Sequence, residues 1–183
     1  MKKLLVILAM ALAPLAASAQ QGAAPPAAPE ANPVSNALRG IVARESRVVV
    51  AGAEEMPADK YSYHPTPEQM TFGKLVAHMA TSNFGLCATI SGVPAPKLDD
   101  LQETDPKDKL VGALKASFDF CTTSLANLDD SKLGEPLPFF GGRTAPRATL
   151  MFVLASDFSD HYSTEASYLR LNGLLPPSAQ PRK

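Results

Sequence analysis

His78, Asp157 and His161 are the residues whose types and spacing could support chemistry in this chain. Asp157 and His161 are four residues apart, which would place them one turn apart on the same side of a helix. A third ligand from a facing helix would complete a facial site for a divalent metal, with open positions for water or substrate. His78 is the natural candidate for that ligand, because the third histidine of the chain, His64, lies in a proline-rich connection.

The same three residues also have a purely structural interpretation. A histidine near an apolar helix stripe is more often a satisfied interior or surface residue than a ligand. An aspartate and a histidine one turn apart can simply form a hydrogen bond. Spacing alone therefore leaves both a metal site and a structural pair open.

The catalytic interpretation requires helices that bring these residues together. Asp157 and His161 continue the apolar face of a long amphipathic segment that begins at Leu150 and is ended by Gly173 and the following prolines. Three other segments have apolar residues at a period near 3.6, with Gly52 and Gly92 as stop signals for the first two. The predicted helices span about residues 34–52, 71–92, 105–128 and 144–173. No strand pattern is evident, so the predicted fold class is all-α, a four-helix bundle with long connections.

The chain divides into four parts by composition. Residues 1–19 carry two lysines, an apolar run and the triplet Ala17-Ser18-Ala19, which predicts a signal peptide rather than a membrane span. Residues 20–33, QQGAAPPAAPEANP, are too poor in large apolar side chains to fold and are expected to be a disordered tether. The bundle domain would occupy residues 34–178, and residues 179–183 a tail. We therefore expect an exported protein, periplasmic or secreted, with no membrane span after cleavage of the signal.

The net charge limits the expected binding partners, and the number and spacing of the cysteines limit the sites that they can form. The formal net charge is −1, and loss of the two lysines in the signal peptide would move it to about −3, so nucleic acid is not an expected partner. Cys87 and Cys121 lack the spacing of a zinc knuckle or a redox motif. In an exported chain a disulfide between them and two buried free thiols are about equally plausible.

Two stretches connect the chain to a known family. They are TFGKLVAHMATSNFGLC at residues 71–87 and DHYSTEASYLRLNGLLPP at residues 160–177. Through them the chain resembles the DinB-like superfamily of metal-dependent four-helix bundle proteins, in particular its exported bacterial members. The resemblance implies a divalent metal held by a histidine of the second helix and two positions four apart in the fourth, often all histidines.

This sequence matches that pattern at His78 and His161 and departs from it at Asp157. A carboxylate can bind zinc, nickel, iron or manganese, so two histidines and one aspartate still form a sensible ligand set. The departure could equally indicate a site that no longer binds metal. A second departure is the presence of Ser163 and Thr164 where many relatives have glycine and glutamine.

The resemblance implies a small-molecule substrate and either metal-dependent hydrolysis or thiol-dependent transfer, while a non-catalytic bundle with a degenerate metal site is the alternative. Glu165 could act as the base or support a ligand, although a solvated glutamate near the helix end is the favoured interpretation. Phe139 and Phe140 are expected to dock a loop onto the bundle rather than to border a pocket. A homodimer through a bundle face is compatible with either function.

Overall fold

The computed structural model describes residues 28–97 and 100–181. The predicted signal peptide and residues 20–27 of the predicted tether lie outside the described residues. Residues 28–32 are exposed and belong to no helix or strand. Within the described part of the chain, no helix is long and apolar enough to cross a membrane.

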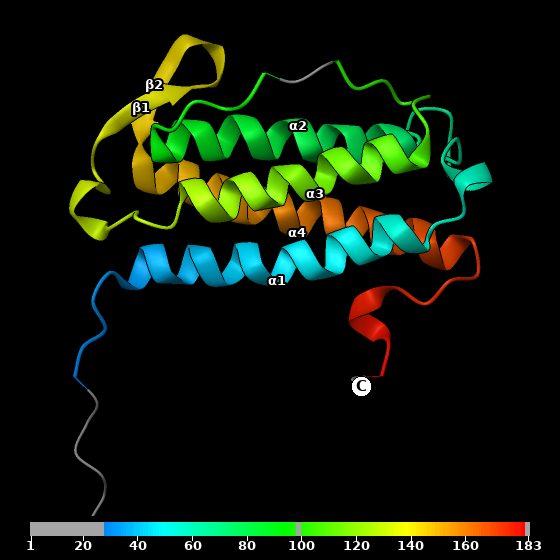
Figure 1. The fold of residues 1–183 in the computed structure, drawn as a ribbon, viewed down its shortest axis with the longest axis horizontal. Coiled ribbons are helices and arrows are strands. Elements are labelled where there is room, and N and C mark those ends of the chain that lie inside the picture. The colour runs from blue at the N-terminus through cyan, green and yellow to red at the C-terminus, as the bar shows by residue number, and fades with distance from the viewer. Residues whose placement is uncertain (1–27, 98–99, 182–183) are drawn as a thin grey trace, which may run out of the picture. The chain divides into compact units, whose positions relative to one another are not determined.

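Four long helices pack side by side, which confirms the predicted all-α bundle (Figure 1). They are α1 (Pro33–Glu55), α2 (Phe72–Ser91), α3 (Lys107–Ser124) and α4 (Arg147–Leu171). Helices α2 and α3 run in the same direction, because the connection between them returns along the bundle before α3 begins (Figure 1). Helices α1 and α4 run the opposite way, so α2 and α4 are antiparallel neighbours.

The structure adds one element that the sequence pattern does not show, a short hairpin that precedes α4. Its strands β1 (Pro136–Phe139) and β2 (Arg143–Pro146) pair antiparallel, and the turn between them contains Gly141 and Gly142 at φ values of 68° and 71°. Four-residue strands that contain prolines are too short to show an alternating pattern. The predicted start of the fourth helix at Thr144 is therefore wrong, since that residue belongs to β2.

Two of the predicted helix ends are confirmed at α2. The Thr71 hydroxyl accepts a hydrogen bond from the Lys74 amide at 3.1 Å, and Gly92 takes the left-handed conformation that closes the helix. Helix α1 begins within one residue of its predicted start but ends later than predicted. It continues past Gly52 to Glu55, and the cap at its start comes from a distant loop, where the Asp130 carboxylate accepts the Ser35 amide at 2.9 Å.

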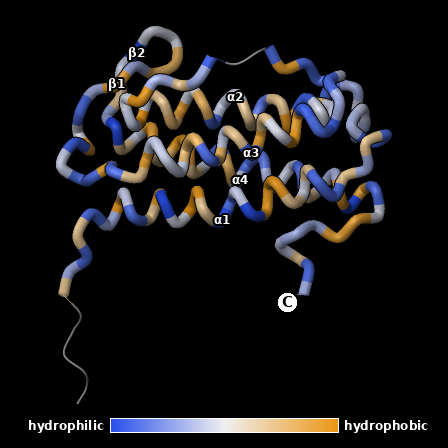
Figure 2. The backbone as a smooth tube through the Cα atoms, viewed as in Figure 1, coloured by the Kyte–Doolittle hydropathy of each residue, from blue (hydrophilic) through white to orange (hydrophobic). Residues whose placement is uncertain are grey.

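The core is formed by the apolar stripes of all four helices, and Figure 2 shows hydrophobic residues recurring along each helix rather than in continuous runs. Cys87 on α2 and Cys121 on α3 form a disulfide, and neither residue is exposed to solvent. The structure therefore contains the disulfide rather than the two free thiols that the sequence left equally open.

Candidate metal centre

The three residues selected from the sequence meet between α2 and α4. His78 lies on α2, Asp157 and His161 lie on α4, and one ligand atom from each falls within 4.8 Å of the others. The two imidazole rings are nearly perpendicular, with their centroids 4.8 Å apart. Nε2 of His161 lies 3.2 Å from Oδ1 of Asp157. The antiparallel packing of α2 and α4 thus brings together residues that are far apart in sequence.

The two histidines have opposite electrostatic surroundings. The short contact with Asp157 raises the pKa of His161, against the opposing effect of burial, and the charges of Asp157 and Asp160 add to the increase. Burial lowers the pKa of His78, and the neighbouring His161 lowers it further. His78 is consequently the imidazole more readily kept neutral, the form in which histidine binds a metal.

These residues fit a divalent metal on two observations. Nε2 of His161 is buried, and although Asp157 is close, no hydrogen bond of good alignment satisfies this nitrogen. The donor set of two imidazoles and one carboxylate suits zinc, nickel, iron or manganese. Bonds of about 2.0–2.2 Å at tetrahedral angles place two ligand atoms about 3.3–3.6 Å apart, so a pair separated by 4.8 Å would have to approach by more than about 1 Å when a metal binds.

A pocket of about 480 Å³, which we call the groove, opens beside His78 and Asp157. Its lining comes from α2, α4 and the hairpin. Phe139 and Phe140 both belong to this lining, and Phe140 is 62% exposed. The prediction that these two aromatic residues dock a loop onto the bundle is confirmed for Phe139, which packs against the core, and is wrong for the exposed Phe140. Contrary to the prediction, both residues also border a pocket.

Glu165 is buried in the structure, whereas the favoured interpretation of the sequence is a solvated glutamate near the helix end. The side chain is completely buried, and neither carboxylate oxygen has a hydrogen-bond partner. It packs against α1 at Gly52, where a Cβ atom would lie 2.8 Å from the carboxyl carbon. Burial raises the pKa of Glu165 well above its ordinary value. The expectation of a solvated helix-end glutamate is wrong, and Glu165 is also absent from the lining of the groove.

The close approach of α1 to Glu165 depends on a glycine that the sequence pattern marks for another purpose. The pattern predicts Gly52 to be a helix stop, whereas in the structure it provides space for a buried carboxyl group.

Tyr168 is buried, and its hydroxyl donates a hydrogen bond to the Met70 carbonyl at 3.0 Å. This is the structural role that its packing position near the end of α4 requires.

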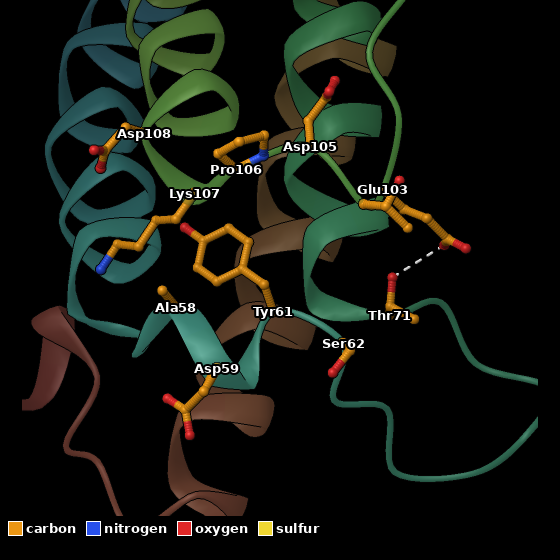
Figure 3. Close-up of a pocket in the computed structure, with 11 residues that line it drawn as sticks. Ala58, Asp59, Tyr61, Ser62, Thr71, Glu103, Asp105, Pro106, Lys107 and Asp108 are labelled. Atoms are coloured by element: carbon orange, nitrogen blue, oxygen red, sulfur yellow. Dashed lines mark hydrogen bonds between the residues drawn. The ribbon is translucent and has the colours of Figure 1, made fainter.

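A second cavity, of about 640 Å³, lies where the connections meet the start of α3, and Figure 3 shows its lining around Tyr61 and Lys107. The Lys107 ammonium group is already engaged, because it donates to the carbonyls of Glu54 and Met56 at the end of α1. None of the three candidate ligands lines this cavity. Its size therefore does not connect it to the metal centre.

A family model described as the DinB superfamily matches residues 42–164, which is more than half of the chain and includes all three candidate ligands. The chain belongs to the DinB superfamily. Solved structures agree with this assignment at the level of the fold. No curated protein matches the sequence.

Two of the similar structures are DinB-like proteins from Bacillus. The protein from Bacillus subtilis has 22% identity and a TM-score of 0.64, with 81% of this chain and 100% of that chain covered. The protein from Bacillus cereus has 14% identity and a TM-score of 0.64, with 78% and 95% covered. At these identities the likeness of this DinB protein to its Bacillus relatives establishes the shared fold.

A third similar structure is a histidine-to-alanine mutant of a mycothiol-dependent maleylpyruvate isomerase. It has 12% identity and a TM-score of 0.58, and the match covers 70% of this chain and 59% of that chain. The DinB bundle described above is therefore also the fold of part of a larger thiol-dependent enzyme.

Proposed function

We propose that this DinB-superfamily protein binds a divalent metal through His78, Asp157 and His161. The observation that carries the proposal is the convergence of two imidazoles and a carboxylate from α2 and α4, with a buried His161 nitrogen that no well-aligned hydrogen bond satisfies. The 3.2 Å contact with Asp157 satisfies this buried nitrogen only in part, and a metal ion bound to both residues would complete its coordination.

The surroundings of the three ligands suit a reaction on a small molecule. The chemistry that a divalent metal supplies in such a position is to lower the pKa of a water or thiol that binds to it. His78 and Asp157 line the groove, so a substrate in the groove would lie directly beside the ligands. Burial lowers the pKa of His78 and biases it toward the neutral form, and Asp157 supplies negative charge that would partly balance the cation.

The proposed reaction class is metal-dependent hydrolysis or thiol-dependent transfer. Membership of the DinB superfamily and the similarity to a mycothiol-dependent isomerase support the thiol-dependent class. We further propose that the protein is exported to the periplasm or secreted, on the basis of the leader-like residues 1–19.

A non-catalytic bundle is the second candidate, and one observation favours it. Asp157 stands where a third histidine is common in the family, and its carboxylate already lies 3.2 Å from His161 Nε2. A self-contained Asp–His pair could replace a metal as the partner of that nitrogen. The two functions differ in whether a metal copurifies with the protein.

Metal analysis of the full chain, purified without an affinity tag or chelator, separates these candidates. We expect a stoichiometric divalent metal in the unmodified protein and its loss in His78→Ala and in His161→Ala. His64→Ala is the matched control, because His64 is exposed and outside the centre, so this variant should keep the metal. Absence of metal in all of them, after reloading with zinc, nickel, iron and manganese, would refute metal binding.

A further inference from the structure

The groove runs along two facing helices, with the candidate metal ligands at one end. Helix α2 contributes residues spaced along one face, and α4 contributes a second row. The two rows are His78, Ser82, Gly85, Leu86 and Thr89 on α2, and Leu150, Val153 and Asp157 on α4. Because α2 and α4 are antiparallel, His78 and Asp157 share one end of the groove, and Thr89 and Leu150 share the other.

The length of the groove follows from helix geometry. At 1.5 Å per residue, the α2 wall from His78 to Thr89 is about 16 Å long, and the α4 wall from Leu150 to Asp157 is about 10 Å long. A water or a single small anion would occupy only the end beside the ligands. An extended molecule is needed to fill the rest.

The far part of the groove is apolar. Leu86, Leu150 and Val153 form its walls, and no lysine or arginine is among the described residues that line it. The nearby Arg143 is occupied by the hairpin itself, where its guanidinium lies 5.4 Å from the centre of the Phe139 ring. The lining of this part of the groove therefore offers no positive charge to an anionic group on a ligand, and the Arg143 guanidinium lies outside the lining, at the exposed edge of the hairpin.

The hairpin adds an aromatic edge to this apolar surface. Phe139 and Phe140 are in contact, with ring centroids 5.0 Å apart, yet Phe140 remains 62% exposed. A large aromatic side chain left exposed beside an apolar groove would gain by covering an apolar ligand. The polar groups in this part are also partly engaged, since the Thr89 hydroxyl donates to the Gly85 carbonyl at 2.9 Å.

We infer that the substrate has two parts: a reactive polar group that lies beside His78 and Asp157, and an uncharged aromatic or branched aliphatic tail that lies between Leu86, Leu150 and the hairpin. This inference rests on the proposed metal-dependent function and specifies its substrate class. It favours apolar esters, amides or electrophiles over sugars, nucleotides and polyanions. The hairpin is then part of the substrate-binding site rather than only a connection between helices.

Hydroxamates with different tails test the inference, because the hydroxamate group chelates a metal and the tail can be varied. Titration calorimetry on the metal-loaded full chain would compare acetohydroxamate, 4-phenylbutanohydroxamate and the monohydroxamate of succinate. Burial of the phenylpropyl group predicts at least about tenfold tighter binding than acetohydroxamate. The carboxylate tail of the succinate derivative should give no such gain.

Gly85 offers a way to block the groove without altering the ligands. A Cβ added at Gly85 would meet no atom within 4 Å, so the larger side chain of Gly85→Leu can enter the groove. We expect this variant to keep its metal and its affinity for acetohydroxamate but to lose the gain from the phenyl tail. Gly112→Leu on α3 is the matched control, because Gly112 is equally open and outside the groove.

The outcomes separate this inference from the proposed function. If metal and acetohydroxamate bind but the phenyl tail gives no gain, or Gly85→Leu keeps the gain, the tail site is refuted and the metal centre stands. If no metal binds, the proposed function fails, and the groove is tested alone with 4-phenylbutyramide by saturation-transfer NMR. Contact signals from its phenyl protons that disappear in Gly85→Leu would support the tail site, and their absence in the unmodified protein would overturn it.

Discussion

Asp157 acts to raise the pKa of the two histidines beside it, most strongly that of His161. Its contact with His161 is the largest cause of the raised pKa of that residue, and its charge also acts to raise the pKa of His78. Asp157→Asn removes this charge, so the pKa of both histidines should fall in the metal-free protein. NMR titration of the imidazole protons, after treatment with a chelator, measures both values.

Asp160→Asn is the control for the Asp157 prediction. Oδ2 of Asp160 lies 3.8 Å from Nδ1 of His161, but the Asp160 side chain is 80% exposed and its charge is well screened by water. Its replacement should lower the pKa of His161 by less than Asp157→Asn does. An equal or larger effect at Asp160 would contradict the assigned role of Asp157.

At the scale of single residues, the sequence is informative where the signal is local. The spacing of Asp157 and His161 predicts that they share a helix face, and the family resemblance selects His78 as their partner. Glu165 is likewise four residues from His161 and so lies on the same side of the helix, yet its burial depends on the approach of α1 at Gly52. The contact between Glu165 and α1 is possible only because Gly52 has no side chain. The residues next to Glu165 in the sequence do not reveal this contact.

Helices α1 and α4 pack against each other at Gly52 and Glu165, where the missing side chain of Gly52 leaves room for the carboxyl group. The new Cβ of Gly52→Ala would lie 2.8 Å from the carboxyl carbon of Glu165, whose complete burial limits how far it can move away. An overpacking cost of about 1–3 kcal/mol, less about 1 kcal/mol gained in helix propensity, should destabilise the fold by up to about 2 kcal/mol. Chemical denaturation gives the free energy of unfolding. Gly40 lies on the same helix, and a Cβ added there would meet no atom within 4 Å. Gly40→Ala should therefore stabilise the folded protein by up to about 1 kcal/mol.

A double-mutant cycle identifies the clash as the cause. Glu165→Ala removes the carboxyl group that the Gly52 Cβ would meet, so Gly52→Ala should cost less in that background than in the unmodified protein. Equal costs in both backgrounds would show that the penalty comes from elsewhere in α1.

The helices are predictable as elements because each combines an apolar stripe with local stop or cap residues. Thr71 caps the start of α2 and Gly92 closes its end, and each acts on the adjacent turn of the helix. Both ends of α2 can therefore be inferred from the sequence. The capping residue of α1 cannot be inferred in this way, because the Ser35 amide donates to Asp130, which is 95 residues away. The hairpin escapes prediction for a different reason, since its four-residue strands are stabilised by pairing with each other and by packing near α4.

The stability of the whole bundle should depend on pH through Glu165. The pKa of this carboxyl group is raised in the folded state above its ordinary value of 4.5, so the folded protein holds a proton that the unfolded chain releases. The contribution of protonated Glu165 is therefore complete below about pH 4.5 and is lost as the pH rises through the folded-state pKa. Glu165→Gln, which is neutral at every pH, should remove this loss.

Denaturation of both proteins between about pH 4 and pH 9 tests the dependence. The unmodified protein should lose stability relative to Glu165→Gln as the pH increases, and Glu68→Gln at an exposed position serves as the control. If the difference in stability between the unmodified protein and the Glu165→Gln variant stays constant over this range, the pKa of Glu165 is the same in the folded and unfolded states, which would contradict the raised pKa.

The disulfide between α2 and α3 has a topological consequence. Cys87 and Cys121 are 34 residues apart, and the covalent ring between them includes the end of α2, the long connection and most of α3. A single cut in the backbone anywhere inside this ring leaves both pieces joined through sulfur. The helix that carries His78 would thus remain tethered to the helix that carries His161 even after proteolysis of the connection.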